Sequence, residues 1–232
     1  MTIAAAAALL LFAGLGRWQW QRGVDKEALW EQFARGDAPA LTAAPAELPR
    51  LPRYARVRLY GRYDGSRQFL LENRSYQGRP GYEVLTVLQL GDGSGMLVNR
   101  GWLPFDGRRD RLPDVALPAS IADVEQRVSG RLERLPSPGL ERGRAAPPLA
   151  GPWPRVTSFP KIEDLQRAYG ARLYDGMLLL DPAEPAGFLR DWRPPGLEPA
   201  RHFSYAIQWW GLGVAVIVLY VGLNLRRRGV TP

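Results

Sequence analysis

Hydrophobic residues gather in two runs near the ends of the chain. The second run, residues 206–225, contains no formally charged residue. A bilayer core is about 30 Å thick and a helix rises about 1.5 Å per residue, so about 20 apolar residues span it. We therefore predict a transmembrane helix over residues 202–225. The first run, residues 3–16, ends in an Arg- and Trp-rich stretch typical of a membrane interface. It predicts a transmembrane helix with its interfacial exit over residues 1–22.

Charge next to the second run predicts the orientation. Arg226, Arg227 and Arg228 follow it directly, and such clusters mark the cytoplasmic side of a membrane. We expect residues 226–232 to form a cytoplasmic basic tail, both termini to be cytoplasmic, and residues 23–201 to form a periplasmic domain at a bacterial inner membrane. A signal peptide is the alternative for the first run, although a basic start and a small-residue cleavage site are missing. Whether the chain begins at its natural start is left open.

The central segment has the period of two that is typical of β-strands. Residues 84–88 are apolar on both faces and predict a central strand, which the Gly-rich turn at 91–95 joins to the next strand. The predicted strands are 57–63, 68–74, 82–90, 96–102, 124–135 and 177–180, and the predicted helices are 25–33 and 160–169. Residues 135–154 are rich in Pro, Arg and Gly and predict a flexible loop. The predicted fold is a membrane protein in which two transmembrane helices flank a β-rich α+β domain, antiparallel and barrel- or sandwich-like.

Composition removes most kinds of catalytic site. The chain has no cysteine and one histidine, His202. Thiol catalysis, iron–sulfur clusters and Cys- or multi-His metal sites are therefore excluded, and a Ser-His-Asp triad is disfavoured. The net charge of +8 comes from arginines spread along the chain, which is not the clustered basic surface of a nucleic-acid-binding protein. We predict a protein that is not an enzyme and binds no nucleic acid.

Four motifs, in order along the chain, resemble one family. They are Leu-Gly-Arg-Trp-Gln-Trp-Gln-Arg at 15–22, Gly-Arg-Pro-Gly-Tyr at 78–82, Val-Asn-Arg-Gly-Trp-Leu-Pro at 98–104, and His-Phe-Ser-Tyr-Ala-Ile-Gln-Trp at 202–209. Together with the two-span layout they resemble the surfeit-locus-one (Shy1-like) family of cytochrome c oxidase assembly factors. The resemblance implies a membrane factor that helps mature oxidase subunit I and, in bacterial members, binds and delivers haem a, with His202 as the expected iron ligand.

The residues around His202 suit such a cofactor. Haem a needs an axial imidazole, cations for its propionates and aromatic walls. We expect His202 to ligate the iron, and the remaining predicted contacts are Arg17 and Arg22 with the propionates and Trp18, Tyr205 and Trp209 as walls. Residues Asn99, Arg100, Gly101 and Trp102 either cap this site or are structural. Gly211 and Ala215 would let the helices approach closely below it.

Other interpretations stay open at this point. An interfacial histidine can bind headgroups or backbone instead of iron, and interfacial Trp and Arg are ordinary membrane anchors. The expected partners are oxidase subunit I, haem a synthase and membrane lipids. The alternative function is a haem-free scaffold that stabilises subunit I. A sensor domain is disfavoured because only residues 226–232 follow the second run, and an exported enzyme is disfavoured because catalytic motifs are missing.

Overall fold

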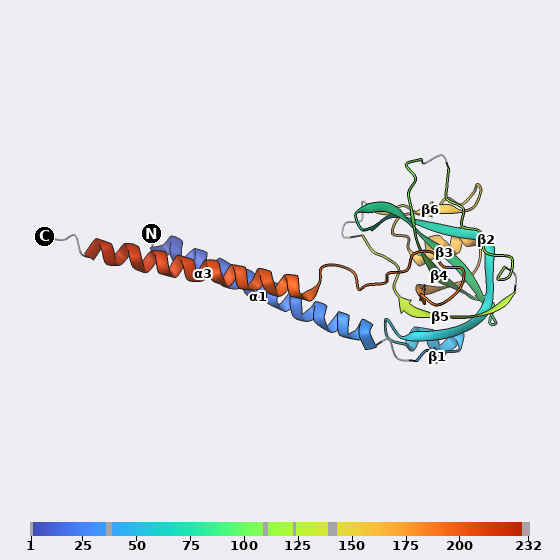
Figure 1. The fold of residues 1–232 in the computed structure, drawn as a ribbon, viewed down its shortest axis with the longest axis horizontal. Helices are drawn as coiled ribbons and strands as arrows, with labels where there is room; N and C mark the ends of the chain where they lie inside the picture. The colour runs from blue at the N-terminus through green and yellow to red at the C-terminus, as the bar shows by residue number, and fades with distance from the viewer. Residues whose placement is uncertain (1, 36–38, 109–110, 123, 139–142, 229–232) are drawn as a thin grey trace. The chain divides into compact units, whose positions relative to one another are not determined.

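The computed structural model describes residues 2–35, 39–108, 111–122, 124–138 and 143–228, which divide into two compact units (Figure 1). The helical unit consists of the described residues up to Ala34 and from Arg193 onward, and the sheet domain consists of the described residues from Arg35 to Trp192. Residues 23–34 and 193–201, which the sequence analysis placed in the central domain, belong to the helical unit in the structure.

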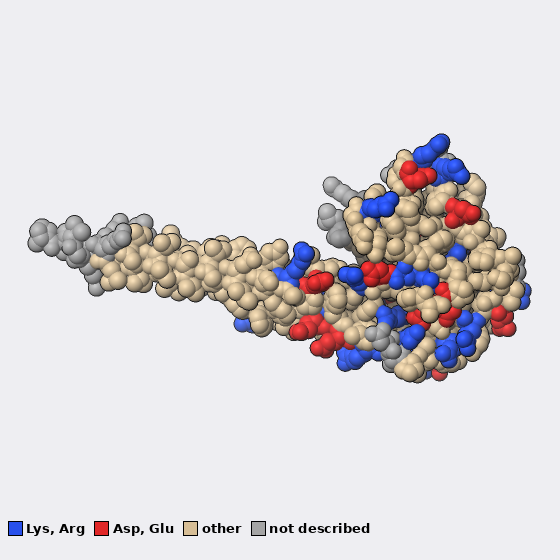
Figure 2. All heavy atoms as spheres, viewed as in Figure 1, with Lys and Arg blue, Asp and Glu red and all other residues tan. Residues whose placement is uncertain are grey.

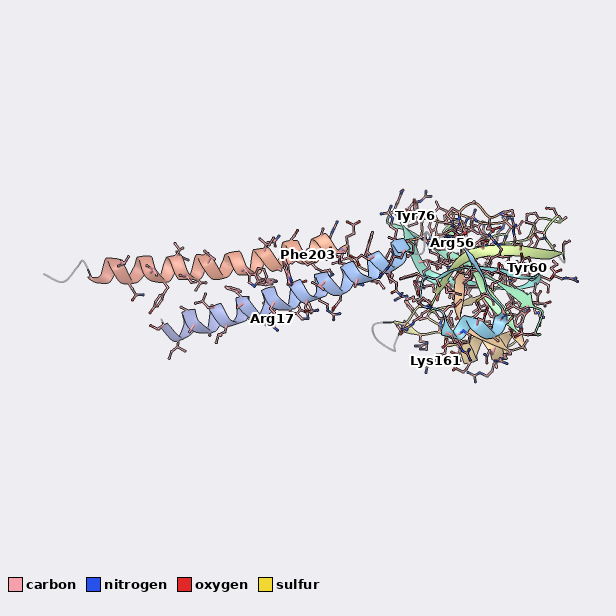
Figure 3. The ribbon with its side chains drawn as sticks, turned by 90° about the horizontal axis from the view of Figure 1, so that it is seen from below. Arg17, Arg56, Tyr60, Tyr76, Lys161 and Phe203 are labelled. Carbon is pink, nitrogen blue, oxygen red and sulfur yellow. The ribbon has the colours of Figure 1, made fainter. Side chains whose placement is uncertain are left out.

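Two long helices, α1 (Thr2–Arg35) and α3 (Pro199–Arg228), form the helical unit. Both are long and apolar enough to cross a membrane, as predicted. Helix α1 continues without a break through the Trp- and Arg-rich stretch and includes the predicted helix 25–33. Helix α3 begins at a proline, whose fixed φ suits the first turn. The helices lie side by side, and their visible surface is uncharged over most of its length (Figures 2 and 3).

The sheet domain consists of a bent sheet, one α-helix and a short 3-10 helix. Its elements are β1 (Leu41–Thr42), η1 (Pro45–Arg50), β2 (Arg56–Tyr76), β3 (Arg79–Leu90), β4 (Gly95–Pro104), β5 (Glu125–Glu133), β6 (Arg155–Thr157), α2 (Ile162–Tyr169) and β7 (Leu173–Leu180). The β2–β3 hairpin turns at Gln77 and Gly78, whose φ values of 48° and 77° are those of a type I′ turn. The Gly-rich turn predicted at 91–95 joins β3 to β4.

The strand pairings lead from β2 through β3, β4 and β7 to β5, and β5 pairs again with the first part of β2. This arrangement arises because β2 is long and bends at a register shift between Asp64 and Gln68. The expected β-rich, sandwich-like domain is confirmed. Its sheet is mixed, however, because β1 and β6 pair with β2, and β7 with β4, in parallel. Alternation predicts a strand but carries no information about its partner or direction, so the antiparallel expectation is wrong for these three ladders.

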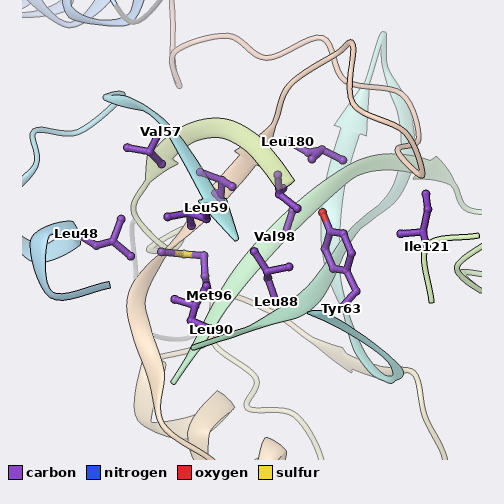
Figure 4. Packing of buried hydrophobic residues seen from close by; sticks show 12 residues of the cluster. Leu48, Val57, Leu59, Tyr63, Leu88, Leu90, Met96, Val98, Ile121 and Leu180 are labelled. Carbon is purple, nitrogen blue, oxygen red and sulfur yellow. The ribbon is translucent and has the colours of Figure 1, made fainter. Parts of the chain in front are cut away.

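Three clusters of buried side chains form the core. The largest brings apolar residues of β2, β3, β4, β5 and β7 together with Leu48 of η1 and Ile121 (Figure 4). A second cluster packs α2 against the sheet through Leu165 and Tyr169, the face predicted from the helical period. Gly170 ends α2 at φ 85°, also as predicted. The described part of the predicted loop, residues 135–138 and 143–154, is largely irregular, and residues 139–142 lie outside the described residues.

Candidate functional site

A heptad seam joins the two long helices. On α1 the half-buried or buried positions include Leu9, Phe12, Gly16, Gln19 and Gly23, and on α3 they include His202, Ala206, Trp209 and Gly213. Both series alternate spacings of three and four residues, the pattern that keeps one helix face against a partner. The smallest residues of the seam are also its buried ones, which lets the two backbones approach closely.

Aromatic rings from α3 pack onto glycines of α1. A Cβ at Gly16 would collide with the indole of Trp210, and a Cβ at Gly23 would lie 2.5 Å from the ring of Phe203. The indole of Trp20 contacts both rings, with centroid distances of 5.7 Å to Trp210 and 4.9 Å to Phe203. These three rings, which we call the aromatic cluster, cover one side of the seam.

His202 lies on the seam and is held by α1. Its Nδ1 is 2.9 Å from Oε1 of Gln19. With the amide oxygen of Gln19 toward the ring, as placed here, Nδ1 donates the hydrogen bond, and in the neutral imidazole the lone pair then lies on Nε2. Among the described residues, Nε2 makes no hydrogen bond. The imidazole is half-buried, and it therefore presents a free ligand atom at the end of an apolar helical pair.

Helix geometry places Trp18, Arg22 and Tyr205 on the side opposite the aromatic cluster. Trp18 and Arg22 are each two residues from Trp20, and Tyr205 is two residues from Phe203, which corresponds to a rotation of about 200°. The guanidinium of Arg22 lies 5.8 Å from the ring of Trp18. Trp18 is 53 % and Tyr205 43 % exposed. We call this side of the seam the open side.

Two predicted site residues lie elsewhere. Arg17 is exposed three residues before Trp20, on the aromatic-cluster side of α1. Trp209 stacks on Phe12 with a centroid distance of 5.8 Å. It is seven residues from His202, which is about 10 Å along the helix. The structure therefore does not bring these two side chains to the imidazole.

Sequence analysis missed the small residues that make the seam. The predicted contact at Gly211 and Ala215 is wrong, because both are exposed and a Cβ at Gly211 would meet nothing within 4 Å. Gly213, two residues away, is the buried one. The signal that would have found the seam is the shared seven-residue spacing of Gly16 with Gly23 and of Phe203 with Trp210. Arg201 was not predicted from the sequence either. It is two residues before Phe203 and therefore lies on the open side.

In the sheet domain, Arg100 is a buried hydrogen-bonding centre of β4. Its side chain is 2 % exposed. Nε donates to the carbonyl of Ala186 at 2.7 Å, and Nη1 donates to Val115 O at 2.8 Å and to Gln68 Oε1 at 2.9 Å. Burial lowers the pKa of Arg100 to about 10, and Tyr63 opposes this effect, so the guanidinium remains charged at neutral pH. The Arg100 side chain thus links β2, through Gln68, to the irregular segments that contain Val115 and Ala186.

The neighbours of Arg100 in the motif are also buried. Asn99 donates to Glu83 Oε2 at 2.7 Å and accepts from the amide of Gly101 at 3.1 Å. Gly101 has φ 115°, and a Cβ there would lie 2.6 Å from the carbonyl oxygen of Leu189. Trp102 bonds in turn to Leu189 through its backbone amide at 2.8 Å. These contacts give the motif a structural role, and its role as a cap over a haem stays a prediction.

Other candidate sites of the domain are weaker. A cavity of about 230 Å³ lies between η1, β5 and β7, with the Arg53–Glu133 ion pair at 2.6 Å on its wall. Its lining includes none of the predicted site residues. Within the described residues, no group of three or more His, Asp or Glu side chains is placed to hold a metal ion.

These features define a class of protein whose chain contains a β-rich domain and a pair of apolar helices, with its one histidine on the helical seam. The family model described as the SURF1 family matches residues 6–214, and the chain belongs to this family, which is known for the assembly of cytochrome oxidase. It is a family of assembly factors, generally without enzymatic activity. The two apolar helices and the family together indicate an inner-membrane protein. No curated protein matches the chain.

Proposed function

We propose that this protein binds haem a on the open side of the helical seam and delivers it to subunit I of cytochrome c oxidase. The observation that carries the proposal is the hydrogen bond between Gln19 and His202, which leaves Nε2 of the histidine free. A bound haem would supply an iron centre that takes an axial imidazole, and His202 would hold it through Nε2.

The surrounding side chains fit a haem on this side. Trp18 and Tyr205 are exposed aromatic side chains on the open side, and they would form walls of the haem site. Arg22 and Arg201 lie on the same side and would pair with the propionate carboxylates. Arg17 does not fit this group because it lies on the opposite side of α1, and we assign it to the lipid headgroups. The aromatic cluster covers the other side of the seam, so we place the haem on the open side.

The proposed orientation follows from charge. In the proposed orientation the C-terminus is cytoplasmic, which the positive-inside rule supports through the three arginines at 226–228. His202 then lies at the periplasmic interface, where a haem could rest with its hydrocarbon tail in lipid. Subunit I is the proposed acceptor of the haem, and haem a synthase is the proposed donor.

An optical redox difference spectrum tests the proposal. The full-length protein would be purified from membranes of a host that makes haem a, together with His202→Ala and with Arg79→Ala, an exposed arginine of the sheet domain. We expect haem a bands in the wild type and in Arg79→Ala, and their loss in His202→Ala. Haem retained by His202→Ala would contradict the ligand assignment. A colourless wild type that copurifies with subunit I would favour the haem-free scaffold.

A further inference from the structure

The structure points to a role for Gln19, and the inference rests on the proposed function. We propose that Gln19 is a positioning residue that holds His202 in the tautomer protonated at Nδ1, with Nε2 presented to the haem iron. Gln19 would not contact the iron. It would act through the imidazole, as the hydrogen-bond partners behind metal-bound histidines do.

The register of the two helices brings Gln19 to His202. Phe12 stacks on Trp209, and the antiparallel direction of the helices then pairs residue 19, seven positions later on α1, with residue 202, seven positions earlier on α3. Both side chains occupy seam positions of the heptad pattern. The pair is therefore set by the backbones of α1 and α3 and needs no contact from the sheet domain.

The packing on either side of the pair restrains it. Gly16 is covered by Trp210, and Gly23 is covered by Phe203, so rings lie one turn below and one turn above Gln19. Both side chains are half-buried on the seam, so breaking the pair would leave their shielded polar atoms with fewer hydrogen-bond partners than in water. We infer that the imidazole is fixed in orientation before any haem arrives.

The tautomer decides whether His202 is a ligand. With the Gln19 oxygen toward Nδ1, the lone pair lies on Nε2, which faces away from Gln19. If the amide were turned so that its NH₂ group donated to Nδ1, the proton of a neutral imidazole would sit on Nε2, and that atom would no longer be a ligand. The two arrangements predict opposite tautomers for the same protein without haem.

The single histidine of the chain makes this measurable. The full-length protein would be labelled with ¹⁵N-histidine, carry a purification tag without histidine, and be studied haem-free in detergent micelles. Nitrogen shifts would give the tautomer. We expect Nδ1–H in the wild type and a shift toward Nε2–H in Gln19→Leu. Gln21→Leu is the matched control, because Gln21 lies on the same helix and, among the described residues, its side chain hydrogen-bonds to Asp25 of that helix at 3.1 Å.

Haem a titration of the same proteins gives the second measurement. Loss of such a partner typically lowers metal affinity by about 10- to 100-fold, and we expect this loss in Gln19→Leu but not in Gln21→Leu. Gln19→Glu keeps an oxygen acceptor, so it should restore binding and lower the haem reduction potential by making the imidazole more basic. A purely structural role for Gln19 would move neither the potential nor the tautomer.

The outcomes separate this inference from the proposed function. A wild type with Nε2–H, or a Gln19→Leu variant with unchanged tautomer and affinity, would overturn the positioning role while haem binding through His202 stands. A wild type with Nδ1–H that takes up no haem a would contradict the proposed function and the positioning role with it. Nδ1–H in the wild type, together with weakened haem binding in Gln19→Leu and its recovery in Gln19→Glu, would support both.

Discussion

The indole of Trp210 packs directly over the backbone of Gly16, in the space that any larger side chain would fill. Ala206, the seam residue of α3 one turn before Trp210, is fully buried. This tightly packed part of the helical pair lies one turn from the Gln19–His202 hydrogen bond. We therefore expect the geometry of that hydrogen bond to depend on this close packing.

Gly16→Val should therefore loosen the helical pair. Overpacking of this kind costs about 1–3 kcal/mol, and we expect a lower melting temperature in detergent and a weaker near-UV circular dichroism signal from the aromatic cluster. Gly14→Val is the control, because it makes the same change on the same helix where a Cβ would meet nothing within 4 Å. Equal effects of the two substitutions would refute the packing of Trp210 on Gly16.

The register of the seam can be tested with a disulfide. A Cβ at Gly213 would lie 3.8 Å from Cβ of Phe12, which is the mean Cβ separation of a disulfide. The chain has no cysteine of its own, so the double variant Phe12→Cys with Gly213→Cys should oxidise to one intramolecular bridge, seen as a mass loss of two hydrogens. The pair Phe12→Cys with Gly211→Cys should stay reduced. Bridging of the control pair instead would place Gly211 in the seam.

The sequence predicted the elements better than their partners. Both apolar helices, the hairpin turn at 91–95 and helix α2 with its stop at Gly170 follow from local patterns, and each is found. The parallel pairing of β7 with β4 and the joining of the predicted strands 57–63 and 68–74 into β2 depend on contacts distant in sequence. The local pattern of apolar and polar residues carries no information about contacts between segments distant in the sequence, so these features could not be predicted from it.

The candidate site shows the same division. Helical spacing placed His202 on a face, and the family motif marked Gln19, but neither showed that the two side chains meet. Gly211 and Ala215 match the usual small-residue motif, whereas the seam uses small residues seven apart. The sequence left open whether residues Asn99 to Trp102 are structural or cap the site. The hydrogen bonds of Arg100 in the folded domain show that its side chain is enclosed.

The two arginines on the open side should matter more for haem than Arg17. Arg201→Ala and Arg22→Ala each remove a cation that would pair with a propionate, and we expect each to weaken haem a affinity by about tenfold. Arg17→Ala removes the same charge from the other side of α1 and should leave the affinity unchanged. Haem a titration of the full-length variants decides this. A loss confined to Arg17→Ala would mean that the haem lies on the aromatic-cluster side.

Arg100 should be needed for the stability of the sheet domain. Arg100→Met removes the donors to Val115 O and Ala186 O, and a buried acceptor left without a partner costs about 1–3 kcal/mol. We expect a clear loss of thermal stability in the full-length protein, and little change in Arg79→Met, whose side chain is exposed. An Arg100→Met variant that melted normally but lost haem would instead support the capping role.

Asp64 should make the domain sensitive to acid. Its carboxylate is 8 % exposed. It accepts hydrogen bonds from Ser66 Oγ at 2.6 Å, Arg67 Nε at 2.8 Å and Tyr169 OH at 2.9 Å. Burial alone would raise the pKa of Asp64, but the hydrogen bonds from Ser66, Tyr169 and Arg67 outweigh it and hold the pKa below its usual value.

The direction of that shift gives the sign of the pH effect. Because the folded pKa is below the unfolded value of about 3.9, the unfolded chain binds the proton first as the pH falls. The stabilisation by Asp64 is therefore complete well above pH 4 and is lost as the pH falls through the folded pKa. We expect Asp64→Asn to cost about 1.5–3 kcal/mol at neutral pH, and its difference from the wild type to shrink below about pH 4.

Denaturant unfolding of the full-length protein at neutral pH and below about pH 4 measures this difference. Asp175→Asn, at an exposed position of β7, should change the stability little at either pH, and an Asp64→Asn penalty that stayed constant on acidification would show that the charge of Asp64 does not stabilise the fold.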